Sequence, residues 1–510
     1  MGAGPVGATL ALLLGRRGRR VDLFEARVAP FPLPRAVHLD HHAARILQAV
    51  GVMDELAPLT EAMDAYEWRS ASGAVLLRLE PDGPGRCGWP ASTMFHQPDL
   101  ERLLARRIDE CSAITVRRGW EVTALDGSEA EVVVSAAAPG GARNSSAATW
   151  VVGCDGVHST TRRCMDVKLR DHGYFYDWLV VDVVADEPAS WHPLNIQVCD
   201  PRRPTTAVSG GRGRRRWEFM VLAGETPEAL AQPDAVWRLL APWGMTPTNA
   251  RLERSALYRF AARSAPRWRT DRLMLAGDAA HQMPPFAGQG LCSGLRDAAN
   301  LAWKLDAVVA ASAPSTLLDT YQRERDPQVA AEIDFSIELG KVICVSDPAA
   351  AALRDEEMAA AARVAGPLPL PTAPPMGAGI FRGRDPDAGL PSVQGVVALD
   401  GRAGRFDDVL DAGGRWVLLG WQNDPRSMLG APAATWLEET GAVVAGVGPG
   451  TPLSDVDGTY GDWFATLAAT AVLVRPDFVV YGAVPRDGGP HALDALVGHA
   501  RAALMGGPGE

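Results

Sequence analysis

The sequence lacks the cysteine pattern of a disulfide-stabilised or zinc-binding protein. Seven cysteines occur in 510 residues, and no two of them have Cys-x-x-Cys spacing. An odd number of scattered cysteines does not predict a disulfide framework or a metal site, and it fits a reducing compartment. We therefore expect a cytoplasmic protein without a bound metal ion.

Positive charge and long apolar runs are scarce as well. The net charge is -11, which argues against a nucleic-acid partner, because such proteins usually present a basic face. The one dense basic run, Arg212 with residues 214–216, is expected to be a solvated turn; a rim that collects an anionic cofactor or substrate is the alternative. The apolar run at residues 8–14 is too short to cross a bilayer and has no positive charge before it, so it predicts a buried helix and no membrane partner.

The chain begins with a glycine pattern, G-x-G-x-x-G, formed by Gly2, Gly4 and Gly7. An apolar helix and a strand that ends in Glu25 are expected to follow. Such glycines let the backbone approach a pyrophosphate at the helix N-terminus, and the acidic residue can accept hydrogen bonds from ribose hydroxyls. The motif normally follows a buried strand, but only Met1 precedes it here, so we expect a mis-assigned start codon with the true start upstream.

Two further segments place a carboxylate beside a glycine at the end of an expected strand. Residues 271–281 run from an apolar strand into Gly277 and Asp278, and a proline- and glycine-rich loop and a helix follow. A carboxylate at this position can bind a polyol hydroxyl, and the N–H groups of the helix N-terminus can hold an electron-rich ring edge. Residues 151–162 hold the second pair, Asp155 and Gly156; a helix N-cap is the structural alternative for Asp155.

Strand-rich segments interrupt the nucleotide-binding segments, which predicts two interleaved domains. A stretch rich in alanine, proline and glycine then predicts a linker, and the strands and helices beyond it predict a small α/β domain. The expected boundaries are residues 1–60, 96–172 and 262–345 for the nucleotide-binding domain, 61–95 and 173–261 for the β domain, 346–395 for the linker, and 396–510 for the C-terminal domain.

In their order and spacing, these segments resemble the single-component FAD-dependent aromatic hydroxylases of the para-hydroxybenzoate hydroxylase class. The similarity is closest to 3-(3-hydroxyphenyl)propionate hydroxylase-like enzymes and to phenol and polyketide hydroxylases; it also rests on residues 34–36, 97–101, 178–182, 199–206, 216–220 and 284–304. The resemblance implies an α/β fold: a discontinuous Rossmann-like FAD-binding domain interleaved with a β-sheet substrate domain, plus a C-terminal thioredoxin-like α/β domain. No cysteine follows Cys344, so the last domain cannot perform dithiol chemistry and is expected to be structural or an oligomer contact, which leaves a homodimer open.

The resemblance also implies an activity. It predicts an NAD(P)H-consuming flavoprotein monooxygenase that hydroxylates a phenolic or aromatic substrate with O2 through a flavin C4a-hydroperoxide. The implied cofactors are FAD and, as a transient reductant, NADPH or NADH; the implied substrate is a small aromatic or polycyclic molecule. The alternative interpretation is the same flavin chemistry used for Baeyer–Villiger oxidation, epoxidation or antibiotic modification of a polyketide-like substrate.

Site residues follow from the resemblance, position by position. Pro285 would face the reacting edge of the flavin and the substrate ring, and His38 and His281 are candidates for the group that takes the phenol proton. For each histidine the structural alternative is a ring bonded to the backbone. The residues expected to hold the cofactor are Gly2, Gly4, Gly7, Glu25, Arg35, Gln97, Val122, Asp155, Gly277, Asp278, Gly288, Gly290 and Leu291.

Overall fold

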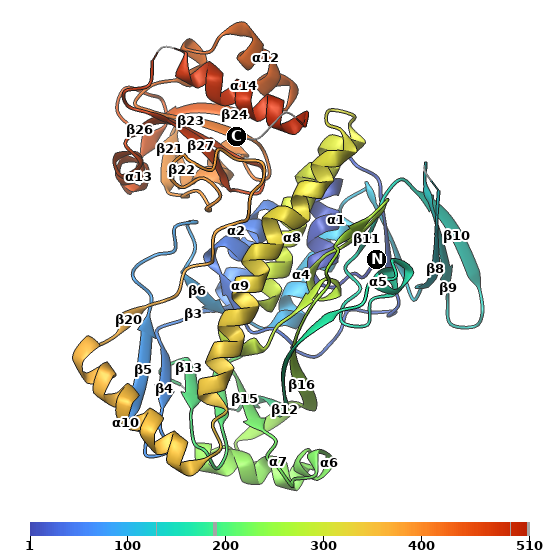
Figure 1. Ribbon diagram of the computed structural model, residues 1–510, viewed down its shortest axis with the longest axis vertical. Helices are drawn as coiled ribbons and strands as arrows, with labels where there is room; N and C mark the ends of the chain where they lie inside the picture. Colours follow the sequence, from blue (N-terminus) through green and yellow to red (C-terminus); the bar gives the residue numbers. More distant parts are fainter. Residues whose placement is uncertain (129, 187–190, 490, 507–510) are drawn as a thin grey trace.

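The computed structural model describes residues 1–128, 130–186, 191–489 and 491–506. Figure 1 shows a helix-rich nucleotide-binding part in the middle of the molecule, a large sheet below it, and the C-terminal part, coloured orange and red, above it.

Short strands and long helices form the nucleotide-binding part. Its strands are β1 (Val21–Glu25), β2 (His38–Asp40), β3 (Glu61–Ala62), β6 (Ser92–Met94), β7 (Ile114–Arg118), β8 (Glu121–Gly127), β9 (Val132–Ala137), β10 (Arg143–Ala148), β11 (Val151–Gly153), β17 (Arg269–Thr270) and β18 (Leu273–Leu275). Its helices are α1 (Pro5–Gly15), α2 (His41–Ala49), α3 (Met53–Leu56), α4 (Gln97–Asp109), α5 (Thr160–Cys164), α8 (Gly290–Val309) and α9 (Asp319–Ile343). Strand β1 pairs in parallel with β7, and β11 pairs in parallel with β18, so segments far apart in the sequence share one nucleotide-binding part.

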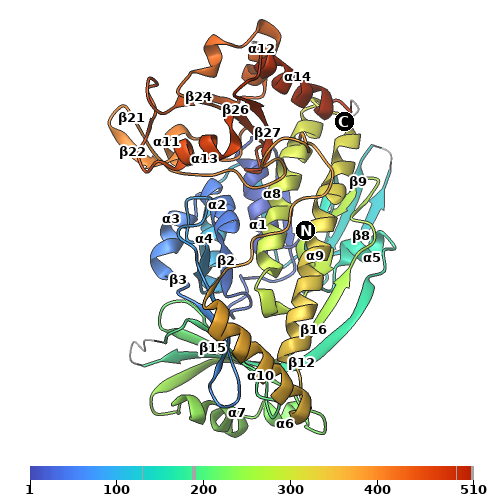
Figure 2. The same ribbon diagram turned by 60° about the vertical axis from the view of Figure 1, so that its left-hand side comes forward.

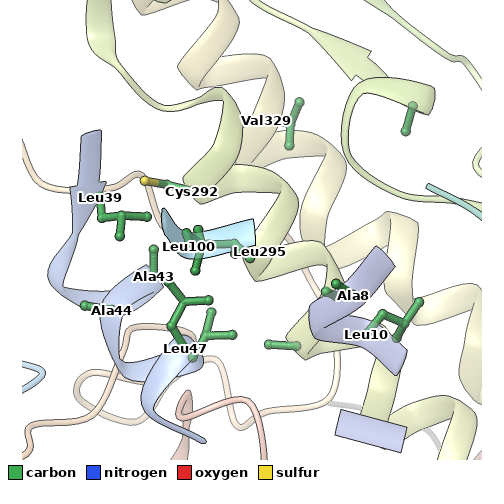
Figure 3. Packing of buried hydrophobic residues seen from close by; sticks show 14 of the residues in the cluster. Ala8, Leu10, Leu39, Ala43, Ala44, Leu47, Leu100, Cys292, Leu295 and Val329 are labelled. Carbon is green, nitrogen blue, oxygen red and sulfur yellow. The ribbon is translucent and has the colours of Figure 1, made fainter. Parts of the chain in front are cut away.

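The helices of this part pack through apolar side chains. Helix α1 is buried over residues 7–15 and packs on α8, because a helix that is apolar all round has no face for solvent. Figure 3 shows the neighbouring cluster, to which α4 contributes Leu100 and α8 contributes Leu295. Gly294 permits the close approach of α8 to α1, since a Cβ there would lie 2.6 Å from Val6 Cγ2. The predicted buried helix at residues 8–14 is thus confirmed.

A nine-stranded sheet forms the second part, in the order β19-β16-β12-β15-β14-β13-β4-β5-β20. The strands are β4 (Tyr66–Arg69), β5 (Val75–Glu80), β12 (Arg170–Ala185), β13 (Asn195–Val198), β14 (Thr205–Ser209), β15 (Arg214–Met220), β16 (Ala250–Ser264), β19 (His281–Gln282) and β20 (Leu368–Pro369). Side chains alternate between its faces. Trp217 and Phe219 of β15 join an apolar cluster that includes α7 (Pro233–Leu240), whereas Arg216 and Glu218 face the nucleotide-binding part.

The segment predicted as a linker, residues 346–395, holds regular structure. Helix α10 (Pro348–Ala365) begins where the Asp347 carboxylate accepts a hydrogen bond from the Ala350 N–H (2.7 Å), and Gly366, with a φ of 67°, follows its end. Alanine has the highest helix propensity, which accounts for a helix in an alanine-rich stretch. Strand β20 then pairs with β5 and adds an edge to the large sheet.

The C-terminal part has the predicted thioredoxin-like topology. Its elements are β21 (Val396–Leu399), β22 (Arg402–Arg405), α11 (Phe406–Leu410), β23 (Val417–Trp421), α12 (Ala431–Glu439), β24 (Val443–Val447), β25 (Ser454–Asp455), α13 (Thr459–Leu467), β26 (Ala469–Val474), β27 (Val480–Pro485) and α14 (Ala492–Leu504). The central sheet has the order β24-β23-β26-β27, with β23 parallel to β24 and antiparallel to β26. Figure 2 shows α12 and α14 on one face of this sheet and α13 on the other.

Buried charges join the C-terminal part to the nucleotide-binding part. Arg475, in the turn after β26, donates to Glu324 Oε2 of α9 (2.8 Å) and to Asp477 Oδ1 (3.0 Å). Lys304 Nζ of α8 lies 2.8 Å from the same Glu324 oxygen, and all four side chains are almost fully buried. We call Lys304, Glu324, Arg475 and Asp477 the junction cluster.

No helix among the described residues is long and apolar enough to cross a membrane, and no group of three His, Cys, Asp or Glu side chains among them could hold a metal ion. The seven cysteines all lie in the described part of the chain, and all are free.

Candidate active site

A cavity of about 1020 Å³ lies between the nucleotide-binding part, the large sheet and the segment after α10. Single ligand sites occupy about 300–1,000 Å³, so the cavity offers room for more than one small ligand or for one large ligand. The glycine loop and Asp278 line one side, the sheet lines another, and residues 369–374 complete the wall.

The glycine loop has the shape of a pyrophosphate-binding turn. Gly2 has a φ of 87°, and a Cβ there would lie 2.4 Å from the Cys154 carbonyl oxygen; at Gly7 a Cβ would lie 2.0 Å from Gly2 O. Gly4 lines the cavity, and a Cβ there would meet no atom within 4 Å. Gly4 is also the N-cap of α1 and provides no capping side chain, so the first N–H groups of the helix can bind an anion.

Asp278 presents an unused carboxylate to the same cavity. Gly277, with a φ of 62°, donates its N–H to Asp297 Oδ2 (3.0 Å) and turns the chain out of β18. Asp278 is exposed to the cavity, and among the described residues no donor forms a hydrogen bond with its carboxylate. Burial by the surrounding protein raises the pKa of this carboxyl, against the opposing charges of His281 and Arg35. A carboxylate held without a partner fits a ligand hydroxyl.

Three other predicted cofactor residues support or line this side of the cavity. The Glu25 carboxylate accepts hydrogen bonds from the N–H groups of Ala3 (2.8 Å) and Arg27 (2.9 Å) and so holds the glycine loop to β1. Gln97 is buried at the cavity wall, where its Oε1 accepts from the Ala36 N–H (2.7 Å). Arg35 also lines the cavity, and its exposed guanidinium lies 4.4 Å from the centre of the Phe31 ring.

Six predicted cofactor residues do not line the cavity. Gly2, Gly7, Glu25 and Gly277 shape or support the loops beside it, whereas Asp155 and Val122 have other roles. Asp155 uses both oxygens within its own turn: Oδ1 accepts from the Ser159 hydroxyl (2.5 Å), and Oδ2 accepts from the N–H (2.9 Å) and hydroxyl (3.0 Å) of Thr161. It therefore shapes the loop before α5, close to the structural alternative considered for it, while its neighbour Gly156 lines the cavity. Val122 of β8 is buried in an apolar cluster with Phe24.

The two candidate histidines have different surroundings. His38 lines the cavity, and its Nδ1 lies 3.0 Å from the Gly288 carbonyl oxygen, to which it donates as a neutral ring. Burial lowers the pKa of His38, so the ring is neutral at pH 7 and Nε2 is left as an acceptor. His281 is 1% exposed and absent from the cavity wall; its Nε2 lies 2.7 Å from Asp297 Oδ2. Of these two candidates, only His38 lines the cavity.

The loop after Asp278 completes this wall. Pro285, Gly288, Gly290 and Leu291 all line the cavity, and their place beside a ring edge stays a prediction. Gly288 has a φ of 65°, and a Cβ there would lie 3.0 Å from His38 Nδ1. Glycine at this position therefore permits both the turn and the contact with His38.

Known proteins match the chain over most of its length. The family model described as "FAD binding domain" matches residues 1–336, and the "HcaD C-terminal domain" matches residues 389–499. The chain is 38% identical to a probable NADH-specific resorcinol 4-hydroxylase of Rhodococcus jostii (strain RHA1), over 94% of this chain and 91% of that protein. The chain belongs to the family of FAD-dependent aromatic hydroxylases.

Other relatives agree with this assignment. This hydroxylase is 33% identical to the 3-(3-hydroxy-phenyl)propionate/3-hydroxycinnamic acid hydroxylase of Mycolicibacterium smegmatis (strain ATCC 700084 / mc(2)155), over 98% of this chain and 92% of that protein. Its fold matches the crystal structure of the flavin-dependent monooxygenase PieE in complex with FAD and substrate, with a TM-score of 0.82, 21% identity and coverage of 99% and 98% of the two chains. The predicted α/β fold, FAD cofactor and flavoprotein monooxygenase activity are confirmed.

The sheet of this hydroxylase supplies cavity residues that the sequence analysis missed. Arg215 and Arg216, expected in a solvated turn, are 2% and 4% exposed within β15, because Asp182 pairs with Arg216 (2.7 Å) and carbonyl oxygens accept from Arg215. Arg216 and Glu218 line the cavity together with Trp68, Gln197 and Thr206. The alternation of charged and aromatic residues along β15 is the sequence signal that predicts a sheet with two different faces.

Proposed function

We propose that the protein hydroxylates a small phenol, with NADH as the electron donor and O2 as the co-substrate. The observation that carries this proposal is that one cavity joins an unpartnered Asp278 and an open Gly4 to a polar sheet face. The substrate class follows the 38% identical relative, whose name states a preference for NADH and activity on resorcinol.

The residues on the first side of the cavity fit FAD. Gly2, Gly4 and Gly7 with the N-terminus of α1 would hold the pyrophosphate, and Asp278 would accept hydrogen bonds from the ribityl hydroxyls. Arg35 and Gln97 would line the cofactor from the opposite wall, and Glu25 would keep the loop in place. The residues expected at the ring edge are Pro285, Gly288, Gly290 and Leu291. When bound there, FAD would supply the hydride acceptor and the site of O2 activation.

His38 is our candidate for the group that accepts the phenol proton. A phenol has a pKa of about 10, so its ionisation at pH 7 costs about 4 kcal/mol without help. The bond to Gly288 O fixes the His38 ring with Nδ1 as the donor, which leaves Nε2 as a neutral acceptor on the cavity wall. His281 is not part of this proposal, because its ring is bonded to Asp297 away from the cavity.

The test is a substrate panel on the FAD-loaded protein. NADH and NADPH oxidation would be followed with neutral phenols, aromatic carboxylates and non-aromatic controls, and products would be identified by mass. We expect resorcinol-like phenols to accelerate NADH oxidation and to yield a product with one additional oxygen atom. NADH oxidation that is indifferent to every phenol, with no oxygenated product, would overturn the proposal.

A further inference from the structure

A row of polar side chains crosses the sheet at the cavity. The strand register pairs Trp68 of β4 with Gln197 of β13, Gln197 with Thr206 of β14, and Thr206 with Glu218 of β15. All four residues line the cavity, so their side chains form one continuous strip on the face opposite the apolar cluster. We call Gln197, Thr206 and Glu218 the sheet row.

The sheet row is only partly satisfied by its own hydrogen bonds. The Thr206 hydroxyl donates to Gln197 Oε1 (2.7 Å), and Gln197 Nε2 donates to the Thr205 carbonyl oxygen (3.1 Å). Glu218 is 7% exposed, and no described residue donates a hydrogen bond to its carboxylate; the nearest cation, Arg216 Nη1, lies 4.0 Å away. A carboxyl group buried at a cavity wall without a donor has the capacity to bind a ligand hydroxyl.

Three cations near the sheet row are already engaged, and a fourth, Arg35, whose exposed guanidinium also lines the cavity, is assigned to FAD in the proposed function. Arg216 binds both oxygens of Asp182 (2.7 and 3.2 Å) and also donates to the Arg35 carbonyl oxygen. Arg254, on the neighbouring strand β16, donates to the Pro34 carbonyl oxygen and stacks on Tyr258. At the far wall, Arg86 pairs with Asp387. This end of the cavity therefore presents a spare acceptor and engaged donors, which favours a neutral hydroxyl over a carboxylate.

We propose that Glu218 and Thr206 bind a hydroxyl substituent of the aromatic substrate, and that Glu218 selects neutral phenols against aromatic carboxylates. This inference rests on the proposed function and names the substrate feature that its cavity recognises. A phenol hydroxyl can donate to the Glu218 carboxylate. When Glu218 is protonated, the phenol oxygen can accept from the carboxyl while the phenol O–H donates to the Thr206 oxygen, whose own hydrogen is donated to Gln197. A substrate carboxylate, in contrast, meets the like charge of ionised Glu218 in a site with low dielectric.

The charge on Glu218 makes the selection dependent on pH. Burial raises the pKa of the Glu218 carboxyl to about 7, against the opposing charge of Arg216; Asp182 adds to the rise and Arg254 opposes it. Tyr66 of β4 also interacts electrostatically with the Glu218 carboxyl. Repulsion of an aromatic carboxylate therefore increases as the pH rises through about 7, while a neutral phenol binds to both forms of Glu218.

Binding of two ligands to the FAD-loaded enzyme tests the inference. Calorimetry would measure Kd for resorcinol and for 3-(3-hydroxyphenyl)propionate at pH values from about 6 to about 8, alongside turnover. In Glu218→Gln we expect resorcinol to bind about tenfold more weakly and the propionate about tenfold more tightly, with loss of the pH dependence for the propionate. Glu228→Gln, which changes an exposed glutamate on α6 (Pro227–Leu230), is the matched control and should leave both Kd values unchanged.

The outcomes separate the two proposals. If the wild-type enzyme oxygenates no phenol, the proposed function fails. If it oxygenates phenols but Glu218→Gln keeps the ratio of the two Kd values and its pH dependence, only the role of Glu218 is overturned. If Glu218→Gln loses FAD or folds poorly, Thr206→Val provides the test. Several-fold weaker binding of resorcinol with an unchanged Kd for the propionate would support hydroxyl binding by the sheet row. An equal loss of affinity for both ligands would overturn it.

Discussion

The cavity and the junction cluster both bury charged side chains, but their partners differ. At the junction, Arg475 donates to Glu324, Asp477 and the Ile380 carbonyl oxygen, and Lys304 reaches the same Glu324. At the cavity, the buried Glu218 carboxylate and the Asp278 carboxylate, which is exposed to the cavity, have no hydrogen-bond donor among the described residues. Burial of an unpaired charge costs several kcal/mol. A ligand that donates hydrogen bonds to such a carboxylate at the cavity wall would offset this cost. Pairing within the protein thus distinguishes charges that hold domains together from charges that await a ligand.

The largest expected effect comes from breaking the junction. Glu324→Gln leaves Lys304 and Arg475 with one carboxylate, Asp477, in a fully buried site. Because removal of one partner of a buried ion pair costs about 3–5 kcal/mol, we expect the free energy of unfolding of the FAD-free protein to fall by that amount. Urea denaturation followed by circular dichroism and tryptophan fluorescence would measure it.

The matched control lies on the same helix. Glu338 of α9 pairs with Lys341 at the surface, where both side chains are more than half exposed. Glu338→Gln should change the free energy of unfolding by at most about 0.5 kcal/mol. Equal destabilisation by the two variants would show that pairing at the junction has no special structural role.

The second prediction compares the two histidines. Asn at position 38 can still donate to Gly288 O but has no equivalent of Nε2, so His38→Asn should lower kcat for phenol hydroxylation about 100-fold, as expected for loss of a general base. His281→Asn removes a ring that is paired with Asp297 away from the cavity, and it should lower Tm while kcat stays near the wild-type value. Steady-state rates across pH and thermal unfolding would separate the two results; a fall in kcat confined to His281→Asn would reverse our assignment.

The fold could be predicted because its signals are local. The spacing of Gly2, Gly4 and Gly7, and the strand that leads into Asp278, each fall within one short stretch of sequence, and the structure has the expected turn at both. The helix at residues 348–365 was missed because proline and glycine on its C-terminal side dominate the composition of that stretch. Its alanines favour a helix, and only their contact with β5 shows where it packs.

The site was harder to predict because its decisive partners are distant in the sequence. Arg216 is buried since Asp182 lies beside it on the next strand, and His281 leaves the cavity since Asp297 lies on the helix behind it. The residues next to the arginine and the histidine in the sequence give no indication of either pairing. The same holds for the sheet row, which strand register assembles from three separate strands.

The third prediction concerns the unpartnered carboxylate. Asp278→Asn should weaken FAD binding by about 2 kcal/mol, as for loss of a hydrogen bond to a charged group. In the FAD-free protein the same change removes an unpaired carboxylate, so the free energy of unfolding should stay the same or rise. Fluorescence titration of apoprotein with FAD and urea denaturation would measure the two quantities. Unchanged FAD affinity together with lower stability would place Asp278 with the structural charges.

The smallest expected effect concerns Lys304, the member of the junction cluster whose pKa is lowered toward neutral pH. Burial lowers the pKa of Lys304 from 10.5 to about 8, against the opposing charge of Glu324. Between these values the unfolded chain binds more protons than the folded protein, so the free energy of unfolding should rise with pH from about 8 upward. Relative to Lys304→Met, which cannot titrate, the wild-type protein should gain about 1 kcal/mol between about pH 7 and pH 9. If the free energy of unfolding instead depends on pH identically in the two proteins, the carboxylates of the junction cluster fully compensate the burial of Lys304. Lys304 is then as well stabilised in its charged form as Arg475.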